Sequence, residues 1–198
     1  MGAVLAIERD GVVYLGADAV RRSDALRYYV NEESNLKIHR LPSGILCAAI
    51  GRSAFAQQMY LHEEWFQLAE GERFDKDFLV RRVIPSYYRE IKDLDGWRHP
   101  KSGFASHVDT SFIFAHGSDI YVVRGDLSVL KCRGAAAISD NDADEILVSY
   151  ACASRIASPE ETIRRAFGLA SRVRRGISTR GILINTRDFL LTKMEETK

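Results

Sequence analysis

The fold of this chain is decided at its start, by residues 2–18, GAVLAIERDGVVYLGAD. Two apolar runs, 4–7 and 12–17, flank a polar turn that ends in Asp10-Gly11. Both turn residues tolerate positive φ, and Asp-Gly between apolar runs is a strong signal for a β-hairpin. We therefore expect the chain to open with two antiparallel strands.

Working outward from this hairpin, strands and helices follow in groups. A polar stretch over 21–35 separates the first hairpin from a second one. In chain order, we expect strands over 36–38 and 45–50, helices over 53–70 and 75–96, a polar loop over 97–107, strands over 111–115, 120–123 and 129–132, helices over 142–155 and 158–175, and strands over 181–184 and 189–191. Pro85 lies inside the second helix and should kink it or mark a late start.

The last of these helices has the clearest ends. Ser158 can cap it, Pro159 suits its first position, Glu161 completes a capping box, and Gly176 ends it. Grouped strands and helix pairs argue against a doubly wound parallel sheet, in which strands and helices alternate singly. They favour an α+β fold, a four-layer α/β/β/α sandwich of two antiparallel sheets flanked by helix pairs. With no linker or repeat, residues 1–198 are expected to form a single domain.

Composition narrows the class of protein. Apolar residues make up 46% of the chain and charged residues 28%, and the formal net charge is +1. This balance gives no global attraction to nucleic acid or to an anionic membrane. The longest apolar run, 45–50, is too short to cross a bilayer, and the start does not resemble a signal peptide. Three cysteines, an odd number, suggest reduced thiols in a cytoplasmic protein.

Neither metal nor cofactor chemistry is indicated by the sequence. The five histidines show no paired spacing of the kind that metal sites use, and no glycine-rich phosphate loop is present. We therefore expect no cofactor. Any ATP-driven unfolding would come from a separate partner chain.

The order of elements, together with several local motifs, resembles proteasome β-subunits and the bacterial peptidase HslV, members of the N-terminal-nucleophile hydrolase superfamily. The resemblance spans residue 2 to about residue 188. The motifs are Gly16-Ala17-Asp18, Leu36-Lys37-Ile38-His39-Arg40-Leu41, Pro42-Ser43-Gly44, Cys47-Ala48-Ala49-Ile50-Gly51 and Thr186-Arg187-Asp188. It implies the same four-layer sandwich, and assembly into rings, usually stacked in pairs around a chamber.

The implied chemistry is peptide hydrolysis by an N-terminal threonine, whose hydroxyl attacks while its own α-amine accepts the proton. Carried over by position, Asp18 is the supporting acid and Lys37 the supporting lysine. Ala49 falls where the family has a glycine whose N–H stabilises the oxyanion. Cys47 is expected at the floor of the primary specificity pocket.

The nucleophile itself is missing. The family's threonine should lie at Gly2 or Ala3, neither of which has a hydroxyl, and the first threonine in the chain is Thr110. No serine or cysteine precedes Ser23. The sequence also departs from the family at two supporting positions, where it has 139–142, SDND, and 174–176, RRG. As written, the chain is not a competent threonine peptidase.

Our leading hypothesis is a noncatalytic, self-assembling ring subunit, a homo-oligomer that needs neither nucleic acid nor membrane. The rival is an active peptidase or amidase that uses a different start site or a relocated nucleophile such as Ser23 or Cys47. A weaker third hypothesis is a small-molecule amide hydrolase, because fold does not fix function.

Simpler structural roles are also open for the residues named above. Asp18 could pair with Arg21 or Arg22, and Lys37 could be a solvated strand residue. The arginines at 172, 174, 175 and 180 could bind an acidic partner, although complementing a helix end explains most of them.

Overall fold

A computed structural model describes residues 2–23, 26–29, 37–94, 108–140, 142–154 and 157–194, with the backbone alone described over 20–23 and 26–29. The strands form two five-stranded sheets, in the orders β10-β1-β2-β11-β12 and β5-β6-β7-β8-β9, and a separate pair, β3-β4. Every neighbouring pair in the two large sheets is antiparallel. No helix among the described residues is both long enough and apolar enough to cross a membrane.

The strands are β1 Ala3–Arg9, β2 Val12–Asp18, β3 Val20–Ser23, β4 Leu26–Tyr29, β5 Ile38–Arg40, β6 Leu46–Gly51, β7 Thr110–His116, β8 Asp119–Val123, β9 Val129–Cys132, β10 Ala135–Ser139, β11 Gly181–Asn185 and β12 Thr192–Met194. The helices are α1 Ser53–Leu61, α2 Lys76–Phe78, α3 Ile84–Ile91, α4 Asp144–Ala153 and α5 Pro159–Val173, with 3₁₀ turns η2 Pro42–Gly44 and η3 Glu63–Phe66 and a π-helical segment η4 Leu79–Val83.

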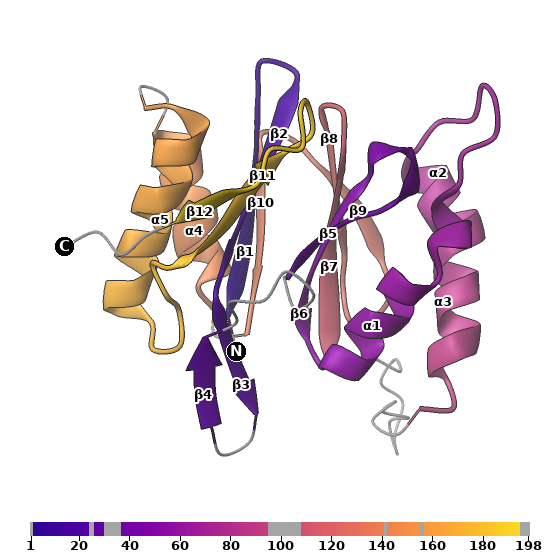
Figure 1. Ribbon diagram of the computed structural model, residues 1–198, viewed down its shortest axis with the longest axis horizontal. Helices are drawn as coiled ribbons and strands as arrows, with labels where there is room; N and C mark the ends of the chain where they lie inside the picture. The colour runs from indigo at the N-terminus through magenta and orange to yellow at the C-terminus, as the bar shows by residue number, and fades with distance from the viewer. Residues whose placement is uncertain are drawn as a thin grey trace.

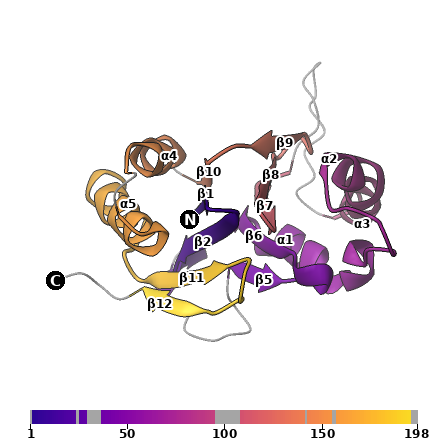
Figure 2. The same ribbon diagram turned by 90° about the horizontal axis from the view of Figure 1, so that it is seen from above.

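The two sheets face each other and each carries helices on its outer side, α4 and α5 on one and α1 to α3 on the other (Figures 1 and 2). Three apolar clusters fill the spaces between the four layers. One lies between the sheets, around Leu15, Ala48 and Ile113. The other two lie under the helix pairs, around Phe167 and around Phe112. The expected four-layer sandwich is confirmed.

The opening hairpin also forms as expected. Val4 pairs with Ala17 and Arg9 with Val12, so the turn falls on Asp10 and Gly11, both with positive φ. Gly16 is required by packing, because a Cβ atom there would overlap the Ile163 side chain of α5. The period-2 pattern therefore places one face of the hairpin on the other sheet and the opposite face on α5.

In the first large sheet, β10 and β12 differ from the sequence prediction. β10 was not expected, because Ala135, Ala136 and Ala137 lack the β-branched side chains that mark strands. It forms through pairing with β1, a partner far away in the chain. The last strand lies at 192–194, beyond the expected 189–191, because residues 186–188 form a turn and Phe189 has a φ of 57°.

The first predicted helix is too long. It ends at Leu61, because His62 leaves the helical region at φ −99° and ψ 63°. The His62 ring then stacks on Trp65 at 4.3 Å between centroids, and a 3₁₀ turn carries Phe66 into the core. The expected end at Gly71 was therefore wrong.

The second predicted helix starts as expected, with the Asp75 carboxylate accepting from the Phe78 N–H at 2.9 Å. It changes to π-helical geometry over η4 just before Pro85. The wider turn is where a proline, which lacks an N–H, is accommodated. The expected loop over 97–107 and the expected helix end at residue 96 lie outside the described residues.

The polar stretch over 21–35 was expected to separate two hairpins, and no strand was predicted in it. The structure forms β3 and β4 there, with β3 starting at Val20. The helix pair 142–155 and 158–175 is confirmed as α4 and α5, each a little shorter than expected. Ser158 accepts from the Glu161 N–H at 3.2 Å, as a cap should.

Candidate functional site

The residues that the sequence singled out gather at one end of the sandwich. Gly2 precedes β1, Asp18 ends β2, and Lys37 precedes β5. Gly181, the first residue of β11, pairs with Asp18 in the same sheet. These segments are far apart in sequence, and only the antiparallel register of the two sheets brings their ends together.

Asp18 is the best-held carboxylate of the site. Its side chain is fully buried and contacts the Lys37 ammonium. Its Oδ1 atom also accepts from the Ala3 N–H at 3.0 Å, and its Oδ2 atom accepts from the Ser178 N–H at 3.2 Å. Burial raises the pKa of the Asp18 carboxyl, while Lys37 and the two backbone donors oppose that rise. Asp18 therefore orders Lys37 and both flanking backbone segments.

Lys37 is buried, with 9% of its side chain exposed. A solvated strand lysine was the simplest expectation, and the structure places the ammonium against Asp18 inside the protein. The Lys37 carbonyl meanwhile accepts from the Ala49 N–H at 3.2 Å. The pairing of Asp18 with Lys37 is thus an observed contact, and its role is a matter for proposal.

Gly2 stands where the sequence analysis expected the nucleophile, and a side chain there would have to displace Lys37. A Cβ atom on residue 2 would overlap Lys37 Nζ and would lie 2.6 Å from Asp18 Oδ1. Its φ of 151° also falls in the region that L residues rarely adopt. The ion pair therefore stands in the space that the side chain of a nucleophile would need.

Two of the expected site residues are placed elsewhere. The Ala49 N–H is used in a hydrogen bond to the Lys37 carbonyl, so it does not point to an oxyanion. Cys47 is fully buried in the cluster under α1 and α3, with Phe55, Met59 and Tyr87, so it does not line an open pocket. Burial raises the pKa of the Cys47 thiol well above its usual value. These contacts give no support to the roles expected for Ala49 and Cys47, which stay predictions.

The sequence analysis did not single out Gly51, which ends β6 and lines the cavity described below. Successive N–H groups of a strand point to opposite sides, and the Arg52 N–H donates to the Asp109 carbonyl of the neighbouring segment at 2.8 Å. The Gly51 N–H therefore points to the β5 side, as that of Ala49 does. Gly51 has a φ of 120°, and a Cβ atom there would overlap the Asp109 carbonyl oxygen. The sequence did contain a signal for it, a glycine between the strand 45–50 and the following helix. Gly51 lies two residues after Ala49, the residue that the sequence analysis selected.

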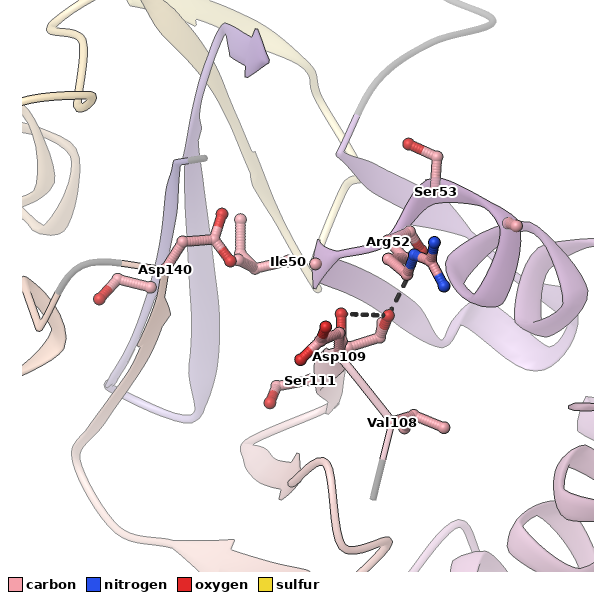
Figure 3. A pocket seen from close by; sticks show the side chains of 11 residues that line it. Ile50, Arg52, Ser53, Val108, Asp109, Ser111 and Asp140 are labelled. Atoms are coloured by element: carbon pink, nitrogen blue, oxygen red, sulfur yellow. Dashed lines mark hydrogen bonds between the residues drawn. The ribbon is translucent and has the colours of Figure 1, made fainter. Parts of the chain in front are cut away.

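A cavity of about 660 Å³ opens beside these residues. It is lined by 50–54, 108–111, Ser139 and Asp140. In Figure 3, Asp140 stands on one side of it, and Arg52, Asp109 and Ser111 stand on the other. The Asp140 N–H donates to the Gly2 carbonyl at 3.2 Å, so the cavity adjoins residue 2.

Two hydroxyls beside this cavity, those of Thr110 and Ser139, make hydrogen bonds to other groups of the chain. The Thr110 hydroxyl contacts the Asp109 carbonyl at 2.7 Å and the Arg52 carbonyl at 3.3 Å. The Ser139 hydroxyl donates to Asp144 at 3.0 Å and accepts from the N–H groups of Ala143 and Asp144 at 2.9 and 3.2 Å. Ser139, the last residue of β10, therefore holds the start of α4 from outside the helix, as a cap-like acceptor.

Replacing Ser139 by Ala should lower the free energy of unfolding by about 1–2 kcal/mol, because the first N–H groups of α4 lose their acceptor. Urea unfolding of the purified protein measures this. Ser149→Ala, at an exposed position within α4, should change the free energy of unfolding by less than about 0.5 kcal/mol. An equal loss in both variants would show that Ser139 is not a cap.

No groups of three or more His, Cys, Asp or Glu side chains that could hold a metal ion occur among the described residues. Comparison by sequence finds no match, since no protein-family model matches the chain and no curated protein does.

Comparison by structure does find proteins of similar fold. Thiobacillus denitrificans BPH is 14% identical, with a TM-score of 0.64 over 98% of this chain and 100% of that one. Eukaryotic HslV from Trypanosoma brucei is 16% identical, with a TM-score of 0.65 over 92% and 98% of the two chains. A mutant of Anbu from Hyphomicrobium sp. strain MC1 is 13% identical, with a TM-score of 0.67 over 98% and 88%. The chain therefore has the HslV-like, proteasome-type fold.

Proposed function

We propose that this chain, with its HslV-like fold, is a noncatalytic subunit that assembles with copies of itself into a ring-type particle. Its site would no longer hydrolyse peptides by a threonine mechanism. The supporting observation is the position of Lys37 Nζ, which stands in the volume that a side chain on residue 2 would occupy. Any ATP-driven unfolding would come from a separate chain.

The residues around Gly2 are arranged in a way that agrees with the absence of a nucleophile. In a threonine mechanism, hydroxyl and α-amine must sit on the same residue. Here the residue has no side chain, and the supporting acid and lysine are closed on each other. Asp18 and Lys37 are then a buried ion pair that holds the ends of β2 and β5 together, a structural role that needs no substrate.

The relocated nucleophiles considered from the sequence gain no support. Cys47 is closed off in the core and its thiol pKa is raised, so the reactive thiolate is disfavoured. The side chain of Ser23 lies outside the described residues. The active peptidase or amidase remains the second candidate because of one observation, the open cavity beside Gly2.

Native mass spectrometry combined with a peptidase assay tests the proposal. We expect a particle larger than a dimer and no turnover of a panel of fluorogenic peptides. BPH of Thiobacillus denitrificans was solved in complex with epoxomicin, and this compound is the probe for the rival. Covalent labelling of this chain by epoxomicin, read from its intact mass, would favour the active enzyme, whereas a monomer would end the assembly proposal.

Gly2→Thr should not restore hydrolysis, and it should lower the free energy of unfolding by about 1–3 kcal/mol through backbone strain at positive φ. Displacing Lys37 would add to the loss. Gly11→Thr is the matched control, because its φ is 77° and nothing lies within 4 Å of an added Cβ atom. The N-terminus of the variant is checked by intact mass. Peptide turnover by Gly2→Thr would show that the site is still organised for catalysis.

A further inference from the structure

Electric charge is unevenly distributed along this nearly neutral chain. Residues 162–187 contain seven arginines and no acidic residue. Residues 63–77 contain six acidic residues against two basic ones. A chain with net charge +1 thus carries a strongly basic segment and a strongly acidic segment.

The two segments lie in opposite outer layers of the sandwich. The basic one begins in α5, and the acidic one follows α1; Figure 1 shows these helices on opposite sides of the two sheets. The layers between them prevent the two surfaces from meeting within one copy. Their charges can be brought together only between molecules.

Exposed apolar side chains lie within the basic segment and just before the acidic one. On α5, Leu169 is 41% exposed and Val173 is 58% exposed, and Arg172 and Arg174 lie next to Val173 in sequence. We call these four residues the basic surface. Among the described residues, the side chains of Arg172 and Arg174 make no hydrogen bond or ion pair.

The opposite layer shows the same combination with the charge reversed. Leu61, the last residue of α1, is 71% exposed, and Glu63 and Glu64 follow it in η3. We call these three residues the acidic surface. Both glutamates are exposed. The Glu64 carboxylate contacts the His62 ring at 2.8 Å, and the Glu64 carbonyl accepts from the Arg82 guanidinium at 3.2 Å.

Gly168 adds an observation on the basic side. It lies in the middle of α5, where glycine costs about 1 kcal/mol relative to alanine. Nothing in the chain requires it, because an added Cβ atom would meet nothing within 4 Å. At 100° per residue it lies on the side of α5 opposite the buried Ala166 and Ala170. A glycine there leaves room for the close approach of another chain.

We propose that the basic surface of one copy docks on the acidic surface of the next, so that copies join head to tail. This rests on the proposed self-assembly and specifies its contact. Opposite charges with apolar centres suit such a pairing, because the charges set the register and the leucines and valine supply burial. A contact between two different surfaces closes into a ring when the rotation per copy allows it.

Self-pairing of α5 through a twofold axis is the alternative, and the charges oppose it. α5 carries Glu160 and Glu161 in its first turn and Arg164, Arg165 and Arg172 further along. An antiparallel partner centred on Gly168 would place Arg172 against Arg164. Arg165 is already paired with Glu161 at 2.6 Å, which leaves less acidic charge to receive them. Head-to-tail docking avoids this repulsion.

Two charge-reversed variants, studied by native mass spectrometry, test the docking. Arg172→Glu/Arg174→Glu makes both surfaces acidic, and Glu63→Lys/Glu64→Lys makes both basic. We expect each variant alone to lose the wild-type particle, with at least a tenfold rise in the monomer fraction. An equimolar mixture should recover particles that hold both variants in equal number, because each surface again meets its opposite. Ser149→Ala serves as the control for an unrelated surface change.

The outcomes separate this inference from the proposed function. A wild-type monomer would refute the assembly itself. A wild-type particle that survives both reversals would refute the docking while leaving the assembly. Loss of the particle in both variants without recovery in the mixture would also refute it, provided circular dichroism shows both to be folded. Disruption by the arginine reversal alone would point to self-pairing of α5.

Discussion

Lys37→Met should lower the free energy of unfolding at neutral pH by about 3–5 kcal/mol, because it leaves the buried Asp18 carboxylate without its cation. Asp18→Asn/Lys37→Met should recover most of this loss, since neither charge is then buried. Urea unfolding of the two variants beside the wild type measures both effects. Lys131→Met is the matched control, because Lys131 pairs with Asp119 at 2.8 Å on the surface. This replacement should change the free energy of unfolding by less than about 1 kcal/mol.

The loss in Lys37→Met should depend on pH in a defined direction. Burial raises the pKa of Asp18 in the folded protein above the ordinary 3.8. A carboxyl of this kind contributes stability below its unfolded pKa, and the contribution is lost as pH rises through the folded pKa. Removing Lys37 takes away the main opposing influence on that pKa. The difference between wild type and variant should therefore widen from pH 4 towards pH 7, and a constant difference would argue against a buried charge as the cause.

Gly51→Ala should lower the free energy of unfolding by about 2–6 kcal/mol, the sum of backbone strain and overpacking. The added Cβ atom would overlap the Asp109 carbonyl oxygen and lie 2.6 Å from Thr110 Cα. Both are backbone atoms that cannot move aside cheaply, because Thr110 pairs with Gly51 and the Asp109 carbonyl accepts from the Arg52 N–H at 2.8 Å. Because Asp109 and Thr110 line the cavity, the variant should also disturb that space.

Gly117→Ala is the control for this glycine. It shares a positive φ, 56°, but nothing lies within 4 Å of an added Cβ atom. We expect it to cost about 1 kcal/mol, the conformational part alone. Thermal and urea unfolding of both variants separate the two contributions. Equal losses would mean that the strand end at Gly51 can relax, and that close backbone contact does not fix this corner of the cavity.

Local signals predicted most elements of the fold and missed those that depend on distant partners. The opening hairpin follows from Asp10-Gly11 between apolar runs, and α5 follows from its cap at Ser158. β10 was missed because its alanines carry no strand signal of their own, and its pairing with β1 spans most of the chain. The early end of α1 was missed because stacking of His62 on Trp65 overrides helical spacing.

The candidate site was also predictable only in part, because local pattern does not show which distant segments meet. Asp18 and Lys37 were identified through the family resemblance, at the end of the second strand and on the third, and the structure brings them into contact. The roles of Ala49 and Cys47 stay predictions, because a shift of one or two residues in a strand changes the assigned face or the group that reaches the site. Position along the motif could not show that Gly51 ends the strand with a φ of 120°.

The sequence by itself determined two things about this protein, the layered order of strands and helices and the absence of a hydroxyl at residues 2 and 3. Both are properties of local pattern and of residue identity, which need no coordinates. Only the tertiary structure decided that Lys37 fills the space beside Gly2, that Cys47 faces the helices, and that charges of opposite sign occupy opposite outer layers. These depend on which strand ends and faces meet, and that is set by pairing between segments far apart in the chain.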